Sequence, residues 1–292
     1  MSAVARVLTD PACVWSWGSE PKLRKLQWEF GPSIEWRWVM GGLARTYGPA
    51  YRDSDGQIGR GVDCFADLMS HWLEASAETG MPSDPRIWTL NRLASTYPAC
   101  QAVKAATEQG PAAAERYLRR CREAILVERT KLDHAEALTA AAGQAGLDVE
   151  RFRIDLASNA ILEAFAADLD EVRAIPDEAR AEGQVRTTEG RERVSFPSVV
   201  FVGTDGSRHG VWGRHPYEAY REAALAAGAE VESDREPSGV EAIERFGRCA
   251  TKEIEVLTGR PRPVVEAELW ALAREWRLRP VAALTGTLWD LA

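Results

Sequence analysis

Histidine and cysteine, the residues that most often bind transition metals, are few in this chain. There are four histidines and five cysteines among 292 residues. Neither set shows the short paired spacings that zinc sites use, so we expect no metal site. The histidines are His71, His134, His209 and His215, and the cysteines are Cys13, Cys64, Cys100, Cys121 and Cys249.

Long apolar runs are also missing. No stretch approaches the roughly 20 apolar residues that a membrane-spanning helix needs. Residues 1–9 lack the charged segment and apolar core of a secretory leader. We therefore expect a cytoplasmic protein with no membrane partner. In that compartment the cysteines stay reduced and form no disulfide framework.

Positive charge is in deficit. Lysine and arginine number 36 against 44 aspartates and glutamates, which gives a net charge of -8. Nucleic-acid partners are not expected, because phosphate contacts need a basic surface. The chain is nevertheless well supplied with hydrophobic residues, at 45%. A folded protein with two or three subdomains is the expectation for this length.

One cysteine lies in a chemically suggestive place. Cys13 follows the short apolar run Val4–Leu8 and precedes an amphipathic pattern over Glu20–Phe30, which we expect to begin at Ser19–Pro21. A thiol at a strand-to-helix junction lies near orphan N–H groups and the helix dipole, which lower its pKa and favour a nucleophilic thiolate. The alternative is a buried structural cysteine.

Ser16 stands where a dithiol motif would have its second cysteine. Its hydroxyl is placed to donate a hydrogen bond to the Cys13 sulfur. Alternatively, Ser16 is an N-cap residue that accepts a hydrogen bond from a backbone N–H group, and both roles are compatible.

The remaining pattern divides the chain into four regions with alternating strand and helix character. Strands are expected over residues 4–8, 34–40, 195–202, 208–212, 278–284 and 287–291. Helices are expected over residues 20–30, 64–79, 85–97, 98–108, 111–130, 131–145, 169–182, 215–227, 240–257 and 264–276, with one more opening at Asp148. Residues 183–193 form a polar stretch, and residues 230–239 are interpreted as a charged linker.

The motif Asp10-Pro11-x-Cys13-x-Trp15-Ser16-Trp17, followed by Glu20-Pro21, resembles the Asp-Pro-x-Cys-Pro-Trp-Cys-Trp start of the DsbA-like thioredoxin superfamily. The most similar branch is that of FrnE-type cytosolic proteins. The superfamily also contains kappa-class glutathione transferases and 2-hydroxychromene-2-carboxylate isomerases. Val39–Gly42 and Ser95–Cys100 add to the resemblance, which covers residues 1 to about 228.

The resemblance implies an α/β fold: a thioredoxin fold with an inserted all-helical domain. The thioredoxin-like domain would comprise residues 1–54 and 169–228, with the helical insertion over residues 55–168. Residues 229–292 lie outside the resemblance, and their pattern of two helices and a terminal hairpin predicts a small winged-helix-like C-terminal extension, suited to packing or dimerisation. A homodimer is therefore an open alternative. Cys64 and Cys100 of the insertion are candidates for a distant resolving thiol, against the plainer interpretation as buried small residues.

The resemblance also suggests site residues beyond Cys13 and Ser16. Pro197 matches the cis-proline that faces the active-site cysteine, although proline is also tolerated at the start of an edge strand. Phe196 would then line the substrate groove with its main chain. Trp15 is expected to form a partly exposed apolar platform beside the cysteine, and Trp17 to point into the core.

Three functions follow as hypotheses. The first is a cytosolic thiol-disulfide oxidoreductase with a monothiol mechanism: Cys13 attacks a protein or low-molecular-weight disulfide, and an external thiol resolves the adduct because Ser16 cannot. No cofactor is bound tightly, and glutathione or mycothiol is the candidate cosubstrate. The second is a thiol-dependent transferase or isomerase of the kappa type. The third is a non-catalytic protein-binding adaptor, for which Cys13→Ala would leave function intact.

Overall fold

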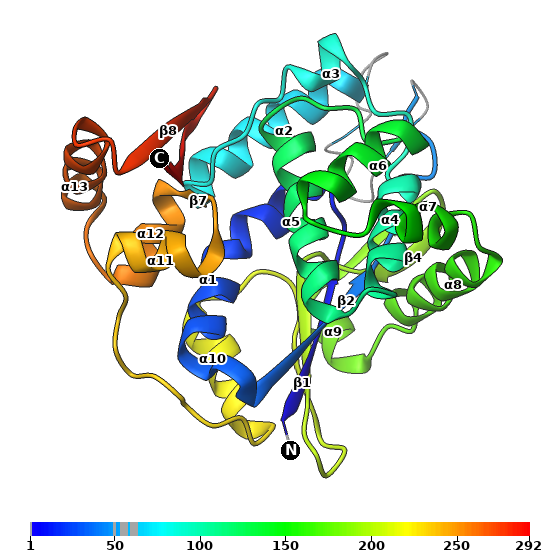
Figure 1. The fold of residues 1–292 in the computed structure, drawn as a ribbon. Coiled ribbons are helices and arrows are strands. Elements are labelled where there is room, and N and C mark those ends of the chain that lie inside the picture. The colour runs from blue at the N-terminus through cyan, green and yellow to red at the C-terminus, as the bar shows by residue number, and fades with distance from the viewer. Residues whose placement is uncertain (1, 49–50, 53–57, 59–63) are drawn as a thin grey trace.

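A four-stranded sheet forms the centre of the molecule (Figure 1). The computed structural model describes residues 2–48, 51–52, 58 and 64–292. In the order β2-β1-β5-β6, β1 pairs in parallel with β2 and antiparallel with β5, and β5 pairs antiparallel with β6. The strands are β1 (Ala3–Thr9), β2 (Ile34–Met40), β5 (Ser198–Val202) and β6 (Arg208–Val211). The α/β class is confirmed.

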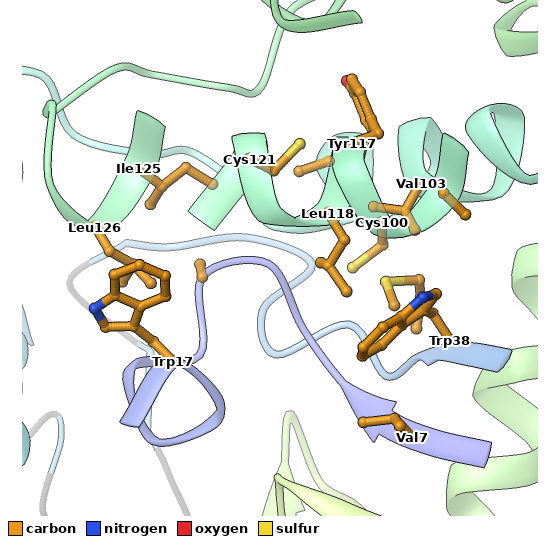
Figure 2. Packing of buried hydrophobic residues seen from close by; sticks show 14 of the residues in the cluster. Val7, Trp17, Trp38, Cys100, Val103, Tyr117, Leu118, Cys121, Ile125 and Leu126 are labelled. Carbon is orange, nitrogen blue, oxygen red and sulfur yellow. The ribbon is translucent and has the colours of Figure 1, made fainter. Parts of the chain in front are cut away.

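Strand β2 shows how the sequence positions the core. Ile34, Trp36, Trp38 and Met40 alternate along it, and all four are buried as the pattern predicts. Figure 2 shows part of the resulting core, in which Leu118 points from a helix of the insertion towards the sheet. The thioredoxin-like sheet and the inserted helices therefore share one hydrophobic core.

Helix α1 (Val14–Phe30) connects β1 to β2 and ends at a short 3-10 turn, η1 (Gly31–Ser33). The expected start at Ser19–Pro21 is wrong, because the helix begins at Val14 and Pro21 lies inside it. The early start is stabilised by Cys13, the N-cap residue, whose sulfur accepts a hydrogen bond from the Ser16 backbone N–H at 3.4 Å. The first turn is thus already closed before the proline removes an N–H donor.

The insertion is helical, as expected, but one predicted helix within it differs. The helix expected over residues 85–97 is wrong, because helix there is limited to α3 and to Tyr97, the first residue of α4. The segment between them bonds instead to residues 44–47, through Tyr47 N–H to Ala94 O and Thr96 N–H to Ala44 O. The helices are α2 (Cys64–Thr79), α3 (Ile87–Leu90), α4 (Tyr97–Thr107), α5 (Pro111–Leu126), α6 (Ala135–Gln144), α7 (Val149–Leu156), α8 (Asn159–Arg173) and α9 (Asp177–Ala181).

The expected helix over residues 169–182 is also wrong as a single element. Helix α8 begins at Asn159 with Ser158 as its cap, and α9 begins again after Pro176, which cannot continue the preceding helix. The expected boundary between residues 168 and 169 therefore falls inside α8. The other boundary, between residues 54 and 55, lies outside the described residues.

The polar stretch over residues 183–193 folds as a β-hairpin. Strands β3 (Val185–Thr188) and β4 (Arg191–Val194) pair antiparallel around Glu189 and Gly190, both with positive φ. That combination is typical of the tight two-residue turns that match the twist of a hairpin. The hairpin leads directly into Phe196 and Pro197.

The C-terminal region follows α10 (Tyr217–Ala226) and a charged linker. The single helix expected over residues 240–257 is wrong, because Gly247 adopts a positive φ and residues 249–250 pair with β9. The resulting order of helix, strand, two helices and hairpin is winged-helix-like, with sheet order β7-β9-β8. Its elements are α11 (Gly239–Phe246), β7 (Cys249–Ala250), α12 (Thr251–Thr258), α13 (Arg262–Arg274), β8 (Leu278–Ala283) and β9 (Gly286–Leu291).

Helix α12 of this extension packs on α1 of the thioredoxin-like unit. Figure 1 shows α11 and α12 beside α1, with the terminal hairpin further out. Among the described residues, no helix has the length and apolar character required to cross a bilayer.

Candidate functional site

Cys13 lines a cavity of about 210 Å³, which lies between residues 12–15 of the motif and the β3–β4 hairpin. The cavity brings together three of the predicted site residues, Cys13, Trp15 and Phe196. The peptide bond between Phe196 and Pro197 is cis. Ser16 and Pro197 do not line the cavity, although each is close in sequence to a residue that does. The thiol itself is poorly accessible, since Cys13 is only 5% exposed.

Burial raises the pKa of the Cys13 thiol above its ordinary value. The Ser16 side chain and its backbone N–H lower the pKa, Asp10 raises it, and Arg193 lowers it by a smaller amount. The direction is opposite to the one expected from a helix N-terminus alone, because loss of hydration outweighs the favourable partners. Cys13 is therefore predominantly a protonated thiol at neutral pH, which is a weak nucleophile.

Asp10, at the start of the motif, is a buried hydrogen-bond acceptor that fixes the backbone before Cys13. It is fully buried, and one carboxylate oxygen accepts hydrogen bonds from Leu43 N–H at 2.7 Å, Thr96 Oγ1–H at 2.9 Å and Cys100 Sγ–H at 3.3 Å. The other oxygen accepts one from Ala12 N–H at 2.8 Å. Burial raises the pKa of Asp10. These bonds join β1 to the loop after β2 and to the start of α4.

The two candidate resolving thiols, Cys64 and Cys100, both donate hydrogen bonds to oxygen atoms away from Cys13. The Cys100 thiol is committed to Asp10, and the Cys64 thiol donates to Gly48 O at 3.2 Å. All five cysteines are buried, and none of them forms a disulfide. No described cysteine is thus paired with Cys13.

Ser16 lies in the first turn of α1 and is not its cap. The N-cap expectation for Ser16 is wrong, because the helix starts early enough that Cys13 takes that position. The Ser16 hydroxyl is buried and has no oxygen or nitrogen partner among the described residues. Its interaction is with the Cys13 thiol, whose pKa it lowers.

The two motif tryptophans separate as predicted. Trp15 is partly buried at the cavity, and its Nε1–H donates to His71 Nε2 at 2.9 Å. The Arg214 guanidinium lies 3.7 Å from the centre of the Trp15 ring. Trp17 is fully buried, and its Nε1–H donates to Pro82 O at 2.7 Å.

Sequence reasoning missed several residues around the cavity. His71 had no sequence neighbour that suggested a role, and its contact with Trp15 is purely tertiary. Arg193 lies over the Phe196 ring, 4.2 Å from its centre, and Arg186 and Arg214 also line the cavity. The alternating pattern around Glu189-Gly190 was the available signal for this hairpin, but its polar composition obscured it.

The described residues contain no cluster of three or more metal-ligating side chains. The cavity is instead lined by aromatic rings and guanidinium groups. Such a surface can bind an extended peptide or a carboxylate-bearing small molecule through hydrogen bonds and ring contacts.

The thioredoxin family model matches residues 7–175. The ClpXP adapter protein SpxH of Halalkalibacterium halodurans is 28% identical over 284 residues, covering 96% of this chain and 86% of that protein. SpxH of Bacillus subtilis is 25% identical over 288 residues, covering 97% of this chain and 87% of that protein. These relatives therefore extend over the C-terminal extension as well.

Among solved structures, the cytosolic disulfide reductase DsbM from Pseudomonas aeruginosa superposes with a TM-score of 0.54 and 20% identity, covering 76% of this chain and 98% of that one. DsbM has also been solved with GSH, and that structure gives a TM-score of 0.52 at 18% identity, covering 76% of this chain and 99% of that one. This likeness confirms the expected DsbA-like thioredoxin fold with its helical insertion and leaves about a quarter of the chain unmatched.

Proposed function

Because the chain belongs to the thioredoxin family, we infer that it uses this fold as a protein-binding adaptor, without redox turnover at Cys13. The observation that carries this inference is the state of the Cys13 thiol. It is 5% exposed, burial raises its pKa, and Ser16 occupies the place of a resolving cysteine. A fold does not by itself specify an activity, so the site decides between catalysis and binding.

The site lacks features that disulfide exchange requires. The attacking sulfur must be ionised and must reach the disulfide in line, and a second thiol must then release the adduct. Here the proton is held on Cys13, and Ser16 places a hydroxyl where the second thiol of a dithiol motif would stand. Relatives that match 96% and 97% of the chain carry the name of an adapter, which supports the binding role.

The relatives are named as adapters of the protease ClpXP. An adaptor of a ClpXP-type protease binds a substrate protein and increases its rate of degradation. We assign the same role to this chain, with the cavity face and the C-terminal extension as the surfaces available for partners.

The test is a measurement of protein half-lives in the native host by pulse-chase proteomics. Deleting the gene should lengthen the half-life of a small set of proteins at least several-fold. The same deletion should have no further effect in a strain that lacks ClpX or ClpP. No change in any half-life, or a change that persists without the protease, would contradict the adaptor role.

A monothiol oxidoreductase is the second candidate, and the cavity beside Cys13 is the observation that favours it. Arg193 lowers the pKa of the thiol, and Phe196, the residue before the cis-proline, lines the same cavity. Cys13 thiolate would attack a substrate–glutathione mixed disulfide and release the substrate thiolate. A second glutathione, or mycothiol, would then attack the Cys13 adduct and leave as the oxidised low-molecular-weight disulfide.

Turnover of a glutathione mixed disulfide by the purified protein distinguishes the two candidates. The adaptor role predicts that the wild type and Cys13→Ala give the same background rate in the presence of glutathione. A wild-type rate well above that of Cys13→Ala would establish the oxidoreductase instead.

A further inference from the structure

A second cavity, of about 340 Å³, lies next to the Cys13 cavity and shares Thr188 and Arg193 with it. It is enclosed by the end of β2, by α4 and α8, and by the β3–β4 hairpin, elements that contact one another and lie together in Figure 1. Four of its lining residues are arginines, and we call this cavity the cationic pocket. The four pocket arginines are Arg45, Arg173, Arg191 and Arg193.

None of the four pocket arginines forms an ion pair with a residue that the structure describes. Arg193 donates to Thr188 Oγ1 at 3.2 Å and to Val194 O at 2.8 Å, and Arg173 interacts with the Tyr97 hydroxyl. Elsewhere in the molecule arginines commonly have carboxylate partners; Arg248, for example, contacts three glutamates and aspartates. The cationic pocket therefore carries positive charge that the described protein does not neutralise.

Glu189 also lines the pocket, and its carboxylate offsets one of the four positive charges, so a net positive charge remains. One oxygen of Glu189 accepts hydrogen bonds from the backbone N–H groups of Arg45 and Thr46, at 2.9 and 3.2 Å. The backbone donors that a small anion would use are thus already occupied, and the guanidinium groups remain. Arg191 and Arg193 are two positions apart on β4, so they point to the same side of the strand.

Two glycines allow the walls of the pocket to approach closely. A Cβ at Gly41 would lie 1.8 Å from the Phe196 ring, and one at Gly42, where φ is +61°, would lie 2.7 Å from the Tyr97 ring. Phe196 in turn supports the Arg193 guanidinium, which lies over its ring at 4.2 Å. Arg193 is thereby held between the two cavities in a fixed position.

We propose that the cationic pocket is the docking site for an acidic segment of the protein that the adaptor binds. This proposal rests on the proposed function and names the chemistry of the partner. The four pocket arginines come from three separate elements, which suits a chain carrying several carboxylates better than a single ion. Guanidinium groups bind carboxylates with two parallel hydrogen bonds, and in a chain of net charge -8 this local positive field selects acidic sequences.

The experiment measures fluorescence anisotropy of a labelled hexaglutamate peptide with the full-length protein, and uses hexaglutamine as the neutral peptide. The test variant is Arg45→Gln/Arg191→Gln, since both side chains are exposed and their loss opens no core cavity. The matched control is Arg116→Gln/Arg274→Gln, which removes two exposed arginines that likewise have no ion pair among the described residues.

Wild type should bind hexaglutamate and not hexaglutamine. The test variant should bind about tenfold more weakly, because each exposed ion contact contributes modestly, and the control should bind as wild type does. Affinity should fall as salt rises from about 0.01 M to about 0.15 M, where the Debye length shortens from about 30 Å to about 8 Å. The proposal would be overturned if the test variant and the control bound hexaglutamate equally well, or if hexaglutamine bound as tightly as hexaglutamate. It would also be overturned if the protein bound inorganic phosphate but not hexaglutamate.

These readouts need neither the host protease nor the natural partner. If the wild type does not bind hexaglutamate but the gene deletion does lengthen protein half-lives, the docking site is overturned and the adaptor role stands. If the gene deletion leaves half-lives unchanged but the test variant binds hexaglutamate more weakly than the control, the adaptor role is overturned and the binding site stands.

Discussion

Among single residues, the surroundings of the Cys13 sulfur determine what this chain can do chemically. Burial and Asp10 raise the pKa of the thiol, while Ser16 and Arg193 lower it. The hydration lost on burial is the largest of these effects, and it keeps the proton on sulfur. Cys13 consequently serves the structure as the N-cap of α1, where its sulfur accepts the Ser16 N–H.

The rate of Cys13 alkylation by iodoacetamide should therefore still be rising at the free-cysteine pKa of about 8.5 and reach its midpoint only above it. Because Ser16 and Arg193 each lower the pKa, Ser16→Ala and Arg193→Gln should raise it further and slow alkylation at a given pH. Mass spectrometry of the Cys13 peptide across a pH series measures this, with Cys13→Ser as the control. A midpoint well below 8.5 would contradict the assignment of a protonated thiol.

The position of Cys13 was predictable from its motif, but its ionisation was not. The motif places a thiol at a helix N-terminus, where the local effect favours the thiolate. The opposing desolvation comes from the hairpin and the insertion, which are distant in sequence. The contacts of His71 and Arg193 at the cavity are tertiary in the same sense.

Between elements, a buried ion cluster connects the three parts of the chain. Glu253 of α12 is fully buried and contacts Arg24 of α1 at 3.1 Å and Arg119 of α5 at 2.8 Å. It also accepts the Ala250 N–H at 2.6 Å. Although burial opposes ionisation, the two arginines and this bond outweigh it, and the pKa of Glu253 is lowered. The extension is thus fixed to both the thioredoxin-like helix and the insertion.

Glu253→Gln should lower the free energy of unfolding by about 3 kcal/mol, because it removes the one fully buried carboxylate that Arg24 and Arg119 share and leaves them, among the described residues, only Glu20 and Glu123 as acidic partners. A lowered pKa means that the ionised group stabilises the fold above about pH 4.3, and that this contribution is lost as the pH falls towards the lower folded value. Urea unfolding of both proteins at neutral and acid pH measures this. Loss of the difference between them in acid is the expected signature.

Glu266→Gln is the matched control, since Glu266 is paired with Arg262 on an exposed helix face. It should leave the unfolding midpoint unchanged at neutral pH, as surface pairs contribute little. An equally large loss of stability from both substitutions would contradict the special role of the buried cluster.

Elements with a clear apolar period were predicted well, and elements defined by distant partners were not. The expected helix over residues 64–79 agrees with α2, because its apolar spacing is local information. Residues 240–257 have a similar period, yet the chain breaks at Gly247 so that β7 can pair with β9, some 40 residues later. Residues 85–97 likewise lose helix to hydrogen bonds with residues 44–47.

Across the entire chain, the motif resemblance was sufficient for the α/β thioredoxin fold, because that fold has a fixed order of elements around the cysteine. It was not sufficient for function, which depends on how charge and burial are distributed. The net charge of -8 concealed a pocket of arginines, since these residues are scattered over β4, α8 and the loop after β2. Only the folded arrangement gathers them beside the Cys13 cavity.

The most direct test of the adaptor account is complementation of the gene deletion with Cys13→Ala. Half-lives of the proteins stabilised by the deletion are measured in strains carrying the wild type, Cys13→Ala or no copy, at matched expression. The account predicts that Cys13→Ala restores the wild-type half-lives. Restoration by the wild type alone, with Cys13→Ala folded and present at the same level, would contradict it and assign the function to the thiol.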